Sequence, residues 1–143
     1  MQTIALIAHD KKKEEMLEFV EQHIDLLKGC HLIATNTTGT RIKEKFGIDV
    51  ETMMSGPLGG DQQIGAMIAE GKIDALFFFC DNLIVQGHQN DVSALTRLAS
   101  LYNIAFATNR TTADMILTSP LFKDENYHKI LPTAIENYKN RVL

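Results

Sequence analysis

The sequence predicts an α/β protein built around an open, parallel β-sheet, and three observations lead to this fold class. Short apolar runs alternate with helical patterns about every 20 to 30 residues, as successive βα units do. The run Ala75–Phe79 is apolar without alternation, which is typical of a central strand covered on both faces. The chain has 143 residues, 45% of them hydrophobic, without a long apolar run, so we expect one domain over residues 1–143 with its own core.

The apolar runs place the strands, and the periodic segments between them place the helices. In the first such segment Met16, Val20, Ile24 and Leu27 recur at helical spacing, which predicts an amphipathic helix that covers the sheet. We expect strands at Thr3–Ala8, His31–Ala34, Val50–Met54, Ala75–Cys80 and Ile104–Ala107. We expect helices at Lys11–Leu27, Thr38–Phe46, Asp61–Glu70, Val92–Tyr102, Thr111–Ser119 and Thr133–Val142.

Charge and the start of the chain argue against several classes of protein. The formal net charge is −4, and the basic run Lys11–Lys13 is offset at once by Glu14 and Glu15, so we expect no nucleic-acid partner. The absence of a long apolar run predicts no membrane partner. The chain leads straight into Ile4–Ile7 without a basic segment before it, so we expect no signal peptide and a cytoplasmic location.

Metal and nucleotide motifs are not evident. Cys30 and Cys80 stand far apart without CxxC spacing, so neither a disulfide framework nor a zinc site is expected. His88 and Asp91 could form half of a metal site, but Asp91 is equally suited to cap the following helix, and no third ligand is suggested. Neither GxxxxGK[ST] nor GxGxxG occurs. We therefore predict no metal site, and no nucleotide has positive support.

Polar residues follow the carboxyl end of every expected strand. Open α/β sheets bind their ligands along this edge, so we expect it to form the functional site. The residues concerned are His9-Asp10, Thr35 with Thr37-Thr38-Gly39, Ser55-Gly56, Asp81 and Thr108-Asn109.

The run Ser55–Gln63 sets a glycine-rich loop directly before an acidic residue that opens a helix. Glycines let the backbone approach a ligand closely, and a helix N-terminus favours anions. A carboxylate at Asp61 would be repelled by a bound phosphate. Asp61 therefore either caps the helix or is retained for chemistry on a phosphorylated substrate.

The threonine cluster Thr35–Thr38 supplies small hydroxyl side chains where another helix is expected to begin. It could hold a phosphate together with main-chain donors, and Lys13 could reach the same group as a point charge. The alternative is that Thr37 or Thr38 is only an N-cap. Among the histidines, His9 follows a strand and His88 lies in a polar loop, whereas we expect surface or packing roles for the rest: His23, His31 and His128.

An ordered set of motifs over roughly residues 3 to 120 resembles the methylglyoxal synthase family. The block from Ser55 to Gln63 is the most specific of them, and the others are individually weak. The set comprises Ala8-His9-Asp10, Ala34-Thr35-x-Thr37-Thr38-Gly39, Ser55-Gly56-Pro57-Leu58-Gly59-Gly60-Asp61-Gln62-Gln63-x-Gly65-Ala66, Phe78-x-x-Asp81, His88-x-x-Asp91-Val92-x-Ala94-Leu95 and Ala107-Thr108-Asn109.

The resemblance implies a fold and an activity. The fold would be a flavodoxin-like doubly wound sheet of five parallel strands with helices on both faces, in a single domain that assembles as a homohexamer. The activity would be that of a lyase that converts dihydroxyacetone phosphate into methylglyoxal and inorganic phosphate without metal or organic cofactor.

The resemblance also implies roles for individual residues. Asp61 would be the base that removes a proton from the hydroxymethyl carbon, and His88 would polarise the ketone and move a proton between the enediol oxygens. The catalytic shell would be completed by His9, Asp10, Asp81 and Asp91. The substrate and its phosphate would be held by His9, Lys13, Thr35, Thr37, Thr38, Ser55, Gly56 and His88, with Arg141 reaching in from the C-terminal tail. The resemblance also places Arg97 in contacts between subunits.

The residue chemistry fits these roles, although the sequence departs from the family pattern at three places. A carboxylate is a weak base unless its surroundings raise its pKa or the enolate is strongly stabilised, and several carboxylates with a neutral imidazole at one edge offer both. Asn36 replaces a glycine, Asn82 replaces a proline, and the loop Gly87–Asn90 lacks the family's prolines. No proposed reacting group is lost, but the His88 loop would be less preorganised and turnover slower.

Two other functions remain open from the sequence. The same fold serves as an effector-binding regulatory module of larger synthetases, and such a module need not keep a base such as Asp61. A phosphorylatable signalling receiver of similar topology would need an aspartate after the third strand and a lysine after the fifth. This chain has Ser55 and Thr108 there, which argues against a receiver.

Overall fold

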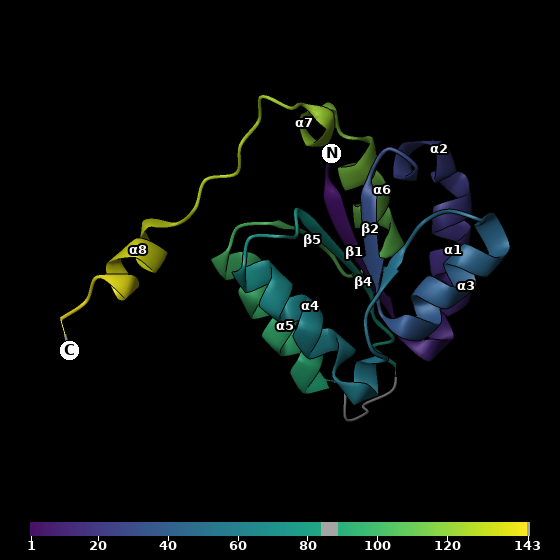
Figure 1. Cartoon of the computed structure of the whole chain (residues 1–143), viewed down its shortest axis with the longest axis horizontal. Coiled ribbons are helices and arrows are strands. Elements are labelled where there is room, and N and C mark those ends of the chain that lie inside the picture. Colours follow the sequence, from purple (N-terminus) through teal and green to yellow (C-terminus); the bar gives the residue numbers. More distant parts are fainter. Residues whose placement is uncertain (84–88, 143) are drawn as a thin grey trace.

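Five parallel strands form one sheet between two layers of helices in the computed structural model, which describes residues 1–83 and 89–142 (Figure 1). The predicted doubly wound sheet with helices on both faces is confirmed. The strands are β1 (Thr3–Ala8), β2 (His31–Ala34), β3 (Glu51–Thr52), β4 (Ala75–Phe79) and β5 (Ala105–Ala107).

The strand order is β3-β2-β1-β4-β5, so the winding direction reverses between β1 and β4. Flavodoxin itself has the order 2-1-3-4-5. The chain therefore shares with flavodoxin the layers and a reversal beside the first strand, but it reaches its third strand by a different path. Ligands of open α/β sheets bind at such a reversal, outside the carboxyl ends of the strands.

The helices on the two faces follow the connections between the strands. Figure 1 shows α1, α3 and α6 on one face of the sheet, and α4 and α5 on the other. The described helices are α1 (Lys13–Gln22), α2 (Ile24–Leu27), α3 (Asn36–Phe46), α4 (Gly60–Ala69), α5 (Gln89–Leu101), α6 (Arg110–Thr118), α7 (Pro120–Lys123) and α8 (Thr133–Lys139), with the 3-10 turns η1 (Asp10–Lys12) and η2 (Gly56–Leu58).

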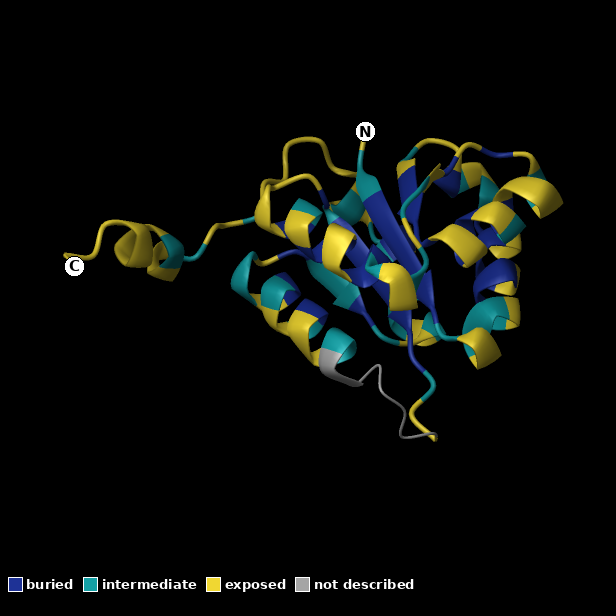
Figure 2. Ribbon diagram, turned by 60° about the horizontal axis from the view of Figure 1, so that its bottom comes forward, coloured by how far each residue is buried: buried dark blue, intermediate teal, exposed yellow. Residues whose placement is uncertain are grey.

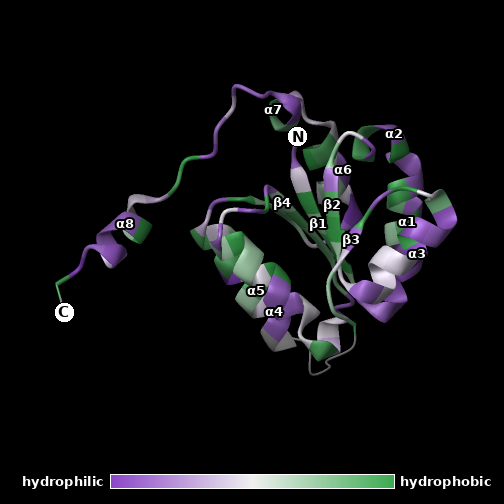
Figure 3. Cartoon of the chain, in the orientation of Figure 1, coloured by the Kyte–Doolittle hydropathy of each residue, from purple (hydrophilic) through white to green (hydrophobic). Residues whose placement is uncertain are grey.

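Alternate side chains of the central strands enter two separate apolar cores. In β1, Ile4 and Leu6 pack in the core under α1, α3 and α6, whereas Ala5 and Ile7 pack in the core under α4 and α5. Every residue of β4 is buried, as the unbroken apolar run predicted. Figure 2 shows the buried sheet between exposed outer helix faces, and Figure 3 shows hydrophobic residues both in the strands and on the helices around them.

The predicted helix at residues 11–27 is broken at His23. The backbone there leaves the helical region, with φ −111° and ψ 23°, and α2 begins one residue later. The His23 ring is buried against Phe19, and its Nε2 lies 2.7 Å from Oδ1 of Asp114 on α6. The packing role expected for His23 is therefore what the structure shows, and this contact between α1 and α6 accompanies the break.

The third strand is shorter than predicted, and this shortening shapes the edge of the sheet. Only Glu51 and Thr52 pair with β2. The backbone N–H of Met54 instead donates to the side-chain oxygen of Gln63 on α4, at 2.8 Å. Met53 still donates to the carbonyl of Ala34 at 2.8 Å, and beyond it the chain turns into the glycine-rich loop that leads to α4.

The C-terminal region also differs from the prediction. An unpredicted helix, α7, begins after Ser119, whose hydroxyl accepts a hydrogen bond from the N–H of Leu121. The last helix, α8, ends at Lys139, three residues before the expected end, and it stands away from the sheet (Figure 1). Asn103 donates to the carbonyl of Ile130 at 2.7 Å and so ties the segment before α8 to the turn between α5 and β5.

Candidate active site

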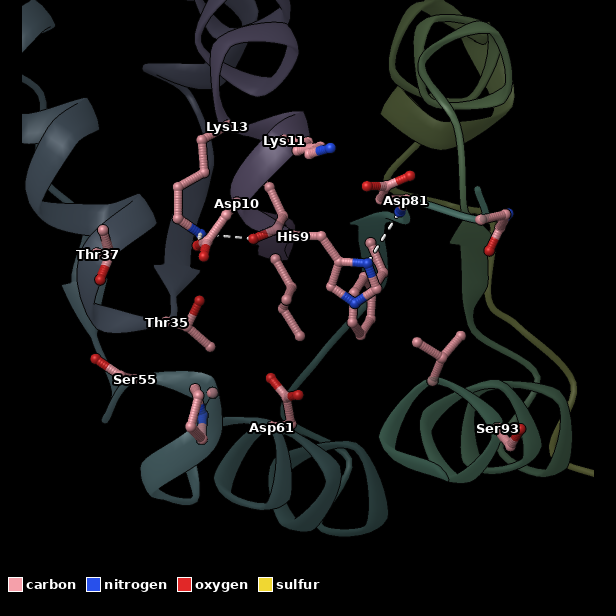
Figure 4. A pocket seen from close by; sticks show the side chains of 17 residues that line it. His9, Asp10, Lys11, Lys13, Thr35, Thr37, Ser55, Asp61, Asp81 and Ser93 are labelled. Carbon is pink, nitrogen blue, oxygen red and sulfur yellow. Dashed lines mark hydrogen bonds and ion pairs between the residues drawn. The ribbon is translucent and has the colours of Figure 1, made fainter. Parts of the chain in front are cut away.

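The carboxyl ends of β1, β2 and β4, with the loop after β3, surround a cavity of about 510 Å³ (Figure 4). A cavity therefore lies at the edge of the sheet that the sequence predicted as the functional site. Most of the residues predicted for the site line this cavity. They are His9, Asp10, Lys13, Thr35, Thr37, Ser55, Gly56, Asp61 and Asp81.

The polar residues after the fifth strand do not line this cavity. Thr108 and Asn109 lie at a smaller hollow of about 340 Å³ beyond Asp81. The side-chain oxygen of Asn109 accepts a hydrogen bond from the N–H of Thr112 at 2.9 Å, so Asn109 caps α6. The polar residue Asn109 after β5 is therefore explained by its role as a helix cap.

Asp61 lies in the first turn of α4, and it is only 4% exposed. Gly59 occupies the N-cap position, so Asp61 is not the cap that the simpler interpretation proposed. Figure 4 shows its carboxyl group pointing into the cavity, toward the space between Thr35 and His9. A buried carboxyl group in a polar cavity is a typical arrangement for acid–base chemistry.

Two glycines make this placement of Asp61 possible. A Cβ atom at Gly60 would overlap the carbonyl oxygen of Met54, so only glycine lets α4 begin so close to the preceding loop. A Cβ atom at Gly56 would lie 3.3 Å from Oδ1 of Asp61, which is tighter than usual. The glycine-rich loop thus serves close packing around the carboxyl group.

The N-terminus of α3 forms a subsite suited to an anion. Thr35 is the N-cap residue and makes no side-chain capping bond, and Thr37 and Thr38 lie inside the first turn. Neither Thr37 nor Thr38 is therefore the N-cap that the alternative interpretation required. Thr38 is 2% exposed, and its hydroxyl has no hydrogen-bond partner among the described residues. The cavity is lined here by Thr35, Thr37 and Ser55, whose hydroxyl groups could bind phosphate oxygens beside the helix N-terminus, whereas Thr38 is not a lining residue.

Lys13 brings a cation to this region. Its ammonium group donates to the carbonyl oxygen of Ala8 at 2.6 Å and lies 3.5 Å from Oδ1 of Asp10. Burial lowers the pKa of Lys13 from its usual value, while the charge of Asp10 acts in the opposite direction. An anion bound beside Lys13 would favour its charged form.

His9 is held in one orientation by the strands around it. Its backbone N–H continues the pairing of β1 with β4 by donating to Phe79 at 3.1 Å, and its ring meets Phe78 edge-on with centroids 5.2 Å apart. The backbone N–H of Asp81 donates to Nδ1 of His9 at 2.9 Å. Because Nδ1 is an acceptor, the neutral ring carries its proton on Nε2.

The remaining acidic residues of the predicted site occupy three different positions. Asp10 opens η1, with its side chain exposed toward Lys13. Asp81 follows β4, and its Oδ1 accepts from the N–H of Leu83 at 3.2 Å. Asp91 lies within the first turn of α5, where its Oδ1 accepts from Nε2 of Gln62 at 2.8 Å.

Among the described residues, the predicted site residues Thr38, Asp91 and Arg141 are not among those that line the cavity. His88 lies outside the described residues. The guanidinium group of Arg141 stacks on the ring of Tyr138 at 3.6 Å and donates to the carbonyl of that residue. Arg97, which the resemblance assigns to contacts between subunits and not to the cavity, is exposed on α5.

The cavity also contains residues that the sequence analysis did not select. The polar ones are Lys11, Asn82 and Ser93, and the apolar ones are Ile7, Ala8, Pro57, Phe78 and Val92. Asn82 could have been found, because it follows Asp81 after a strand. Val92 and Ser93 could not, because the packing of α5 against α4 brings them to the edge.

Metal-binding clusters and membrane-spanning helices are both absent from the described residues. No group of three or more His, Cys, Asp or Glu side chains within residues 1–83 and 89–142 is arranged to hold a metal ion. No helix in the same residues is long and apolar enough to cross a bilayer.

Sequence comparison relates the chain to known proteins. Residues 15–108 match the family model of the MGS-like domain. A methylglyoxal synthase from Clostridium beijerinckii is 54% identical over 114 residues, which cover 80% of this chain and 96% of that protein. A methylglyoxal synthase from Coxiella burnetii is 48% identical over 140 residues, which cover 98% of this chain and 96% of that protein.

Structural comparison gives the same relationship. The chain is similar to the crystal structure of methylglyoxal synthase from Elizabethkingia anophelis, with a TM-score of 0.91 and 44% sequence identity. The match covers 99% of this chain and 92% of that one. The likeness therefore extends over the sheet, both helix layers and the edge where the cavity lies.

Proposed function

Because the chain belongs to the methylglyoxal synthase family, we propose that it converts dihydroxyacetone phosphate into methylglyoxal and inorganic phosphate. The comparisons support an enzyme, a lyase acting on a small phosphorylated substrate, over the regulatory module. The observation that supports the detailed reaction is one cavity that holds both the buried carboxyl group of Asp61 and an anion subsite at the start of α3.

The first step is the removal of a proton. With the phosphate held by Thr35, Thr37, Thr38, Ser55, Gly56 and Lys13, the other end of the triose would lie near Asp61. The Asp61 carboxylate takes a proton from the hydroxymethyl carbon, and the electron pair of that C–H bond forms an enediolate. We assign His88 to polarising the ketone and moving a proton between the two oxygens, and His9 to donating through Nε2–H to the substrate.

The second step is the loss of phosphate. The negative oxygen on the terminal carbon of the enediolate forms the aldehyde C=O bond, and the electron pair of the enediolate C=C bond forms a new C=C bond to the carbon that carries phosphate. The bonding pair of the C–O bond leaves with the departing phosphate ion. The organic product is the enol of methylglyoxal, which takes up a proton on its terminal carbon to form the methyl group. Elimination requires that C–O bond to stand out of the enediolate plane, so positioning of the phosphate is the protein's main contribution. We propose no metal or organic cofactor for either step.

We also propose that the chain acts as a homohexamer. In the single chain Arg141 stacks on Tyr138 on a helix that stands away from the sheet. A role of Arg141 in phosphate binding would therefore require the cavity of a neighbouring copy. Exposed Arg97 is assigned to contacts between subunits. Sedimentation of the purified chain tests the assembly, and a monomer at all concentrations would contradict it.

The proposed reaction is tested by incubating the purified full chain with dihydroxyacetone phosphate. Methylglyoxal and inorganic phosphate should appear in equal amounts, because each turnover releases one of each. The regulatory alternative predicts phosphate binding without either product. Absence of both products across a range of pH and phosphate concentration would remove the enzymatic proposal.

A further inference from the structure

Gln62 connects the first turn of α4 to the first turn of α5. Its side-chain nitrogen Nε2 donates to Oδ1 of Asp91 at 2.8 Å, across 29 positions of the chain. The two helices approach closely, because Gly65 leaves room for Leu95 and Leu98: a Cβ atom there would lie 3.5 Å and 3.3 Å from their terminal methyl groups. The hydrogen bond of Gln62 therefore joins two closely packed helices, α4 and α5.

Three consecutive residues of α4 point to three different parts of the site. Neighbours on a helix are rotated by about 100°, so adjacent side chains diverge. The Asp61 carboxyl enters the cavity, and Gln62 reaches Asp91. The side-chain oxygen of Gln63 accepts from the N–H of Met54 on the loop before Ser55. One helical turn therefore places the base and also orients a second acidic side chain.

We propose that Gln62 is a positioning residue that acts on the reaction through Asp91, a proposal that rests on the function given above. An amide N–H can donate only to an oxygen that presents a lone pair, so the contact fixes Oδ1 of Asp91 as an acceptor directed at α4. One oxygen of the Asp91 carboxylate is thereby held against α4, the helix that carries Asp61. The two carboxyl groups keep separate roles, with Asp61 as the base and Asp91 in the supporting shell.

The proposal is tested with two substitutions of similar size at one position. Gln62→Met removes the donor, and Gln62→Glu sets a second carboxylate against Asp91. We expect kcat to fall roughly five- to tenfold in the first, as for loss of one exposed hydrogen bond, and further in the second because like charges repel. KM for dihydroxyacetone phosphate should stay within about twofold, because Gln62 is not among the residues that line the cavity.

Gln22 provides a matched control. It lies at another exposed contact between helices, where its side-chain oxygen accepts from Arg110 of α6. Gln22→Glu makes the same chemical change there and keeps an acceptor, so kcat should remain that of the wild type. The proposal is overturned by wild-type kcat in both Gln62 variants, by a change in KM alone, or by equal losses in Gln62→Met and Gln62→Glu.

The contact itself can be measured without turnover. In a ¹H–¹⁵N spectrum of the full chain, the side-chain amide signals of Gln62 should shift in Asp91→Ala and remain in place in Gln22→Glu. If the side-chain amide signals of Gln62 do not shift in Asp91→Ala, the proposal is overturned even if the enzyme is active. A wild-type chain that forms no methylglyoxal would instead remove the proposed function, whatever the spectrum shows of the contact.

Discussion

Asp81 donates its backbone N–H to Nδ1 of His9 at 2.9 Å, and this bond joins the residues that follow the two neighbouring strands β1 and β4. Because the donor is part of the main chain, it does not titrate and cannot rotate away. It therefore fixes both the ring orientation and the position of the ring proton. The strand pairing of the sheet thus sets the tautomer of a histidine at the cavity.

This bond leads to a prediction for His9. His9→Asn leaves a side-chain oxygen able to accept from Asp81 but removes the Nε2–H donor, so turnover should fall roughly ten- to a hundredfold with little loss of stability. His9→Phe also leaves the Asp81 N–H unsatisfied and should lower the free energy of unfolding by a further 1 to 3 kcal/mol, roughly. Denaturant titration compares the two variants. Equal stabilities would contradict the role assigned to the bond.

The base is tested by an isosteric change. Asp61→Asn keeps the shape of the side chain but cannot accept a proton, so kcat should fall roughly a hundred- to ten-thousandfold. Phosphate affinity, measured by calorimetry, should fall little or rise, because a negative charge near the anion has been removed. Turnover equal to that of the wild type would exclude Asp61 as the base.

The buried hydroxyl of Thr38 predicts opposite effects on stability and binding. Thr38→Val replaces a hydroxyl that has no partner among the described residues by a methyl group of similar size. In phosphate-free buffer the free energy of unfolding should stay the same or rise by about 1 kcal/mol, whereas phosphate affinity should fall roughly tenfold. Thr40→Val, at an exposed position of the same helix, should change neither quantity. A Thr38→Val chain that binds phosphate normally would remove Thr38 from the anion subsite.

The buried ammonium group of Lys13 predicts how anion binding depends on pH. Burial lowers its pKa below the usual value of 10.5, so Lys13 loses its charge earlier than an exposed lysine as pH rises. Affinity for sulfate, whose charge is constant in this range, should therefore fall as pH rises through that lowered pKa. Lys13→Arg should retain affinity over the same range because a guanidinium group stays charged. A wild-type affinity that is flat with pH would contradict the role of Lys13.

The same shift has a consequence for stability without an anion. The folded pKa of Lys13 lies below the unfolded one, so between the two values the unfolded chain binds more protons. The contribution of Lys13 to stability is therefore present above the unfolded pKa and is lost as pH falls through the folded pKa. In denaturant titrations across this window, the free energy of unfolding of the wild type should therefore rise with pH. In Lys13→Arg it should lack this rise, because the guanidinium group stays charged in both states.

Much of the fold follows from local patterns. The apolar run of β4 predicted a strand covered on both faces, and all of its residues are buried. The prediction was least accurate where a distant contact decides the outcome. His23 packs on Phe19 and pairs with Asp114 at the break between α1 and α2, and β3 ends early where Gln63 binds Met54. Asp114 lies 91 positions from His23, and Gln63 binds Met54 across the glycine-rich loop, so periodicity could not indicate the break or the shortening.

The sequence by itself determined which strands are followed by polar groups. Because the carboxyl ends of parallel strands lie at one edge of the sheet, several of these groups line the same cavity. Only the tertiary structure decided what each of these groups does there. Whether Asp61 caps a helix or enters a cavity depends on how closely Gly60 lets α4 approach Met54. The partner of Asp91 is set by the packing of α4 on α5. Hydrogen bonds act over about 3 Å, so they depend on distances that only the packed helices establish.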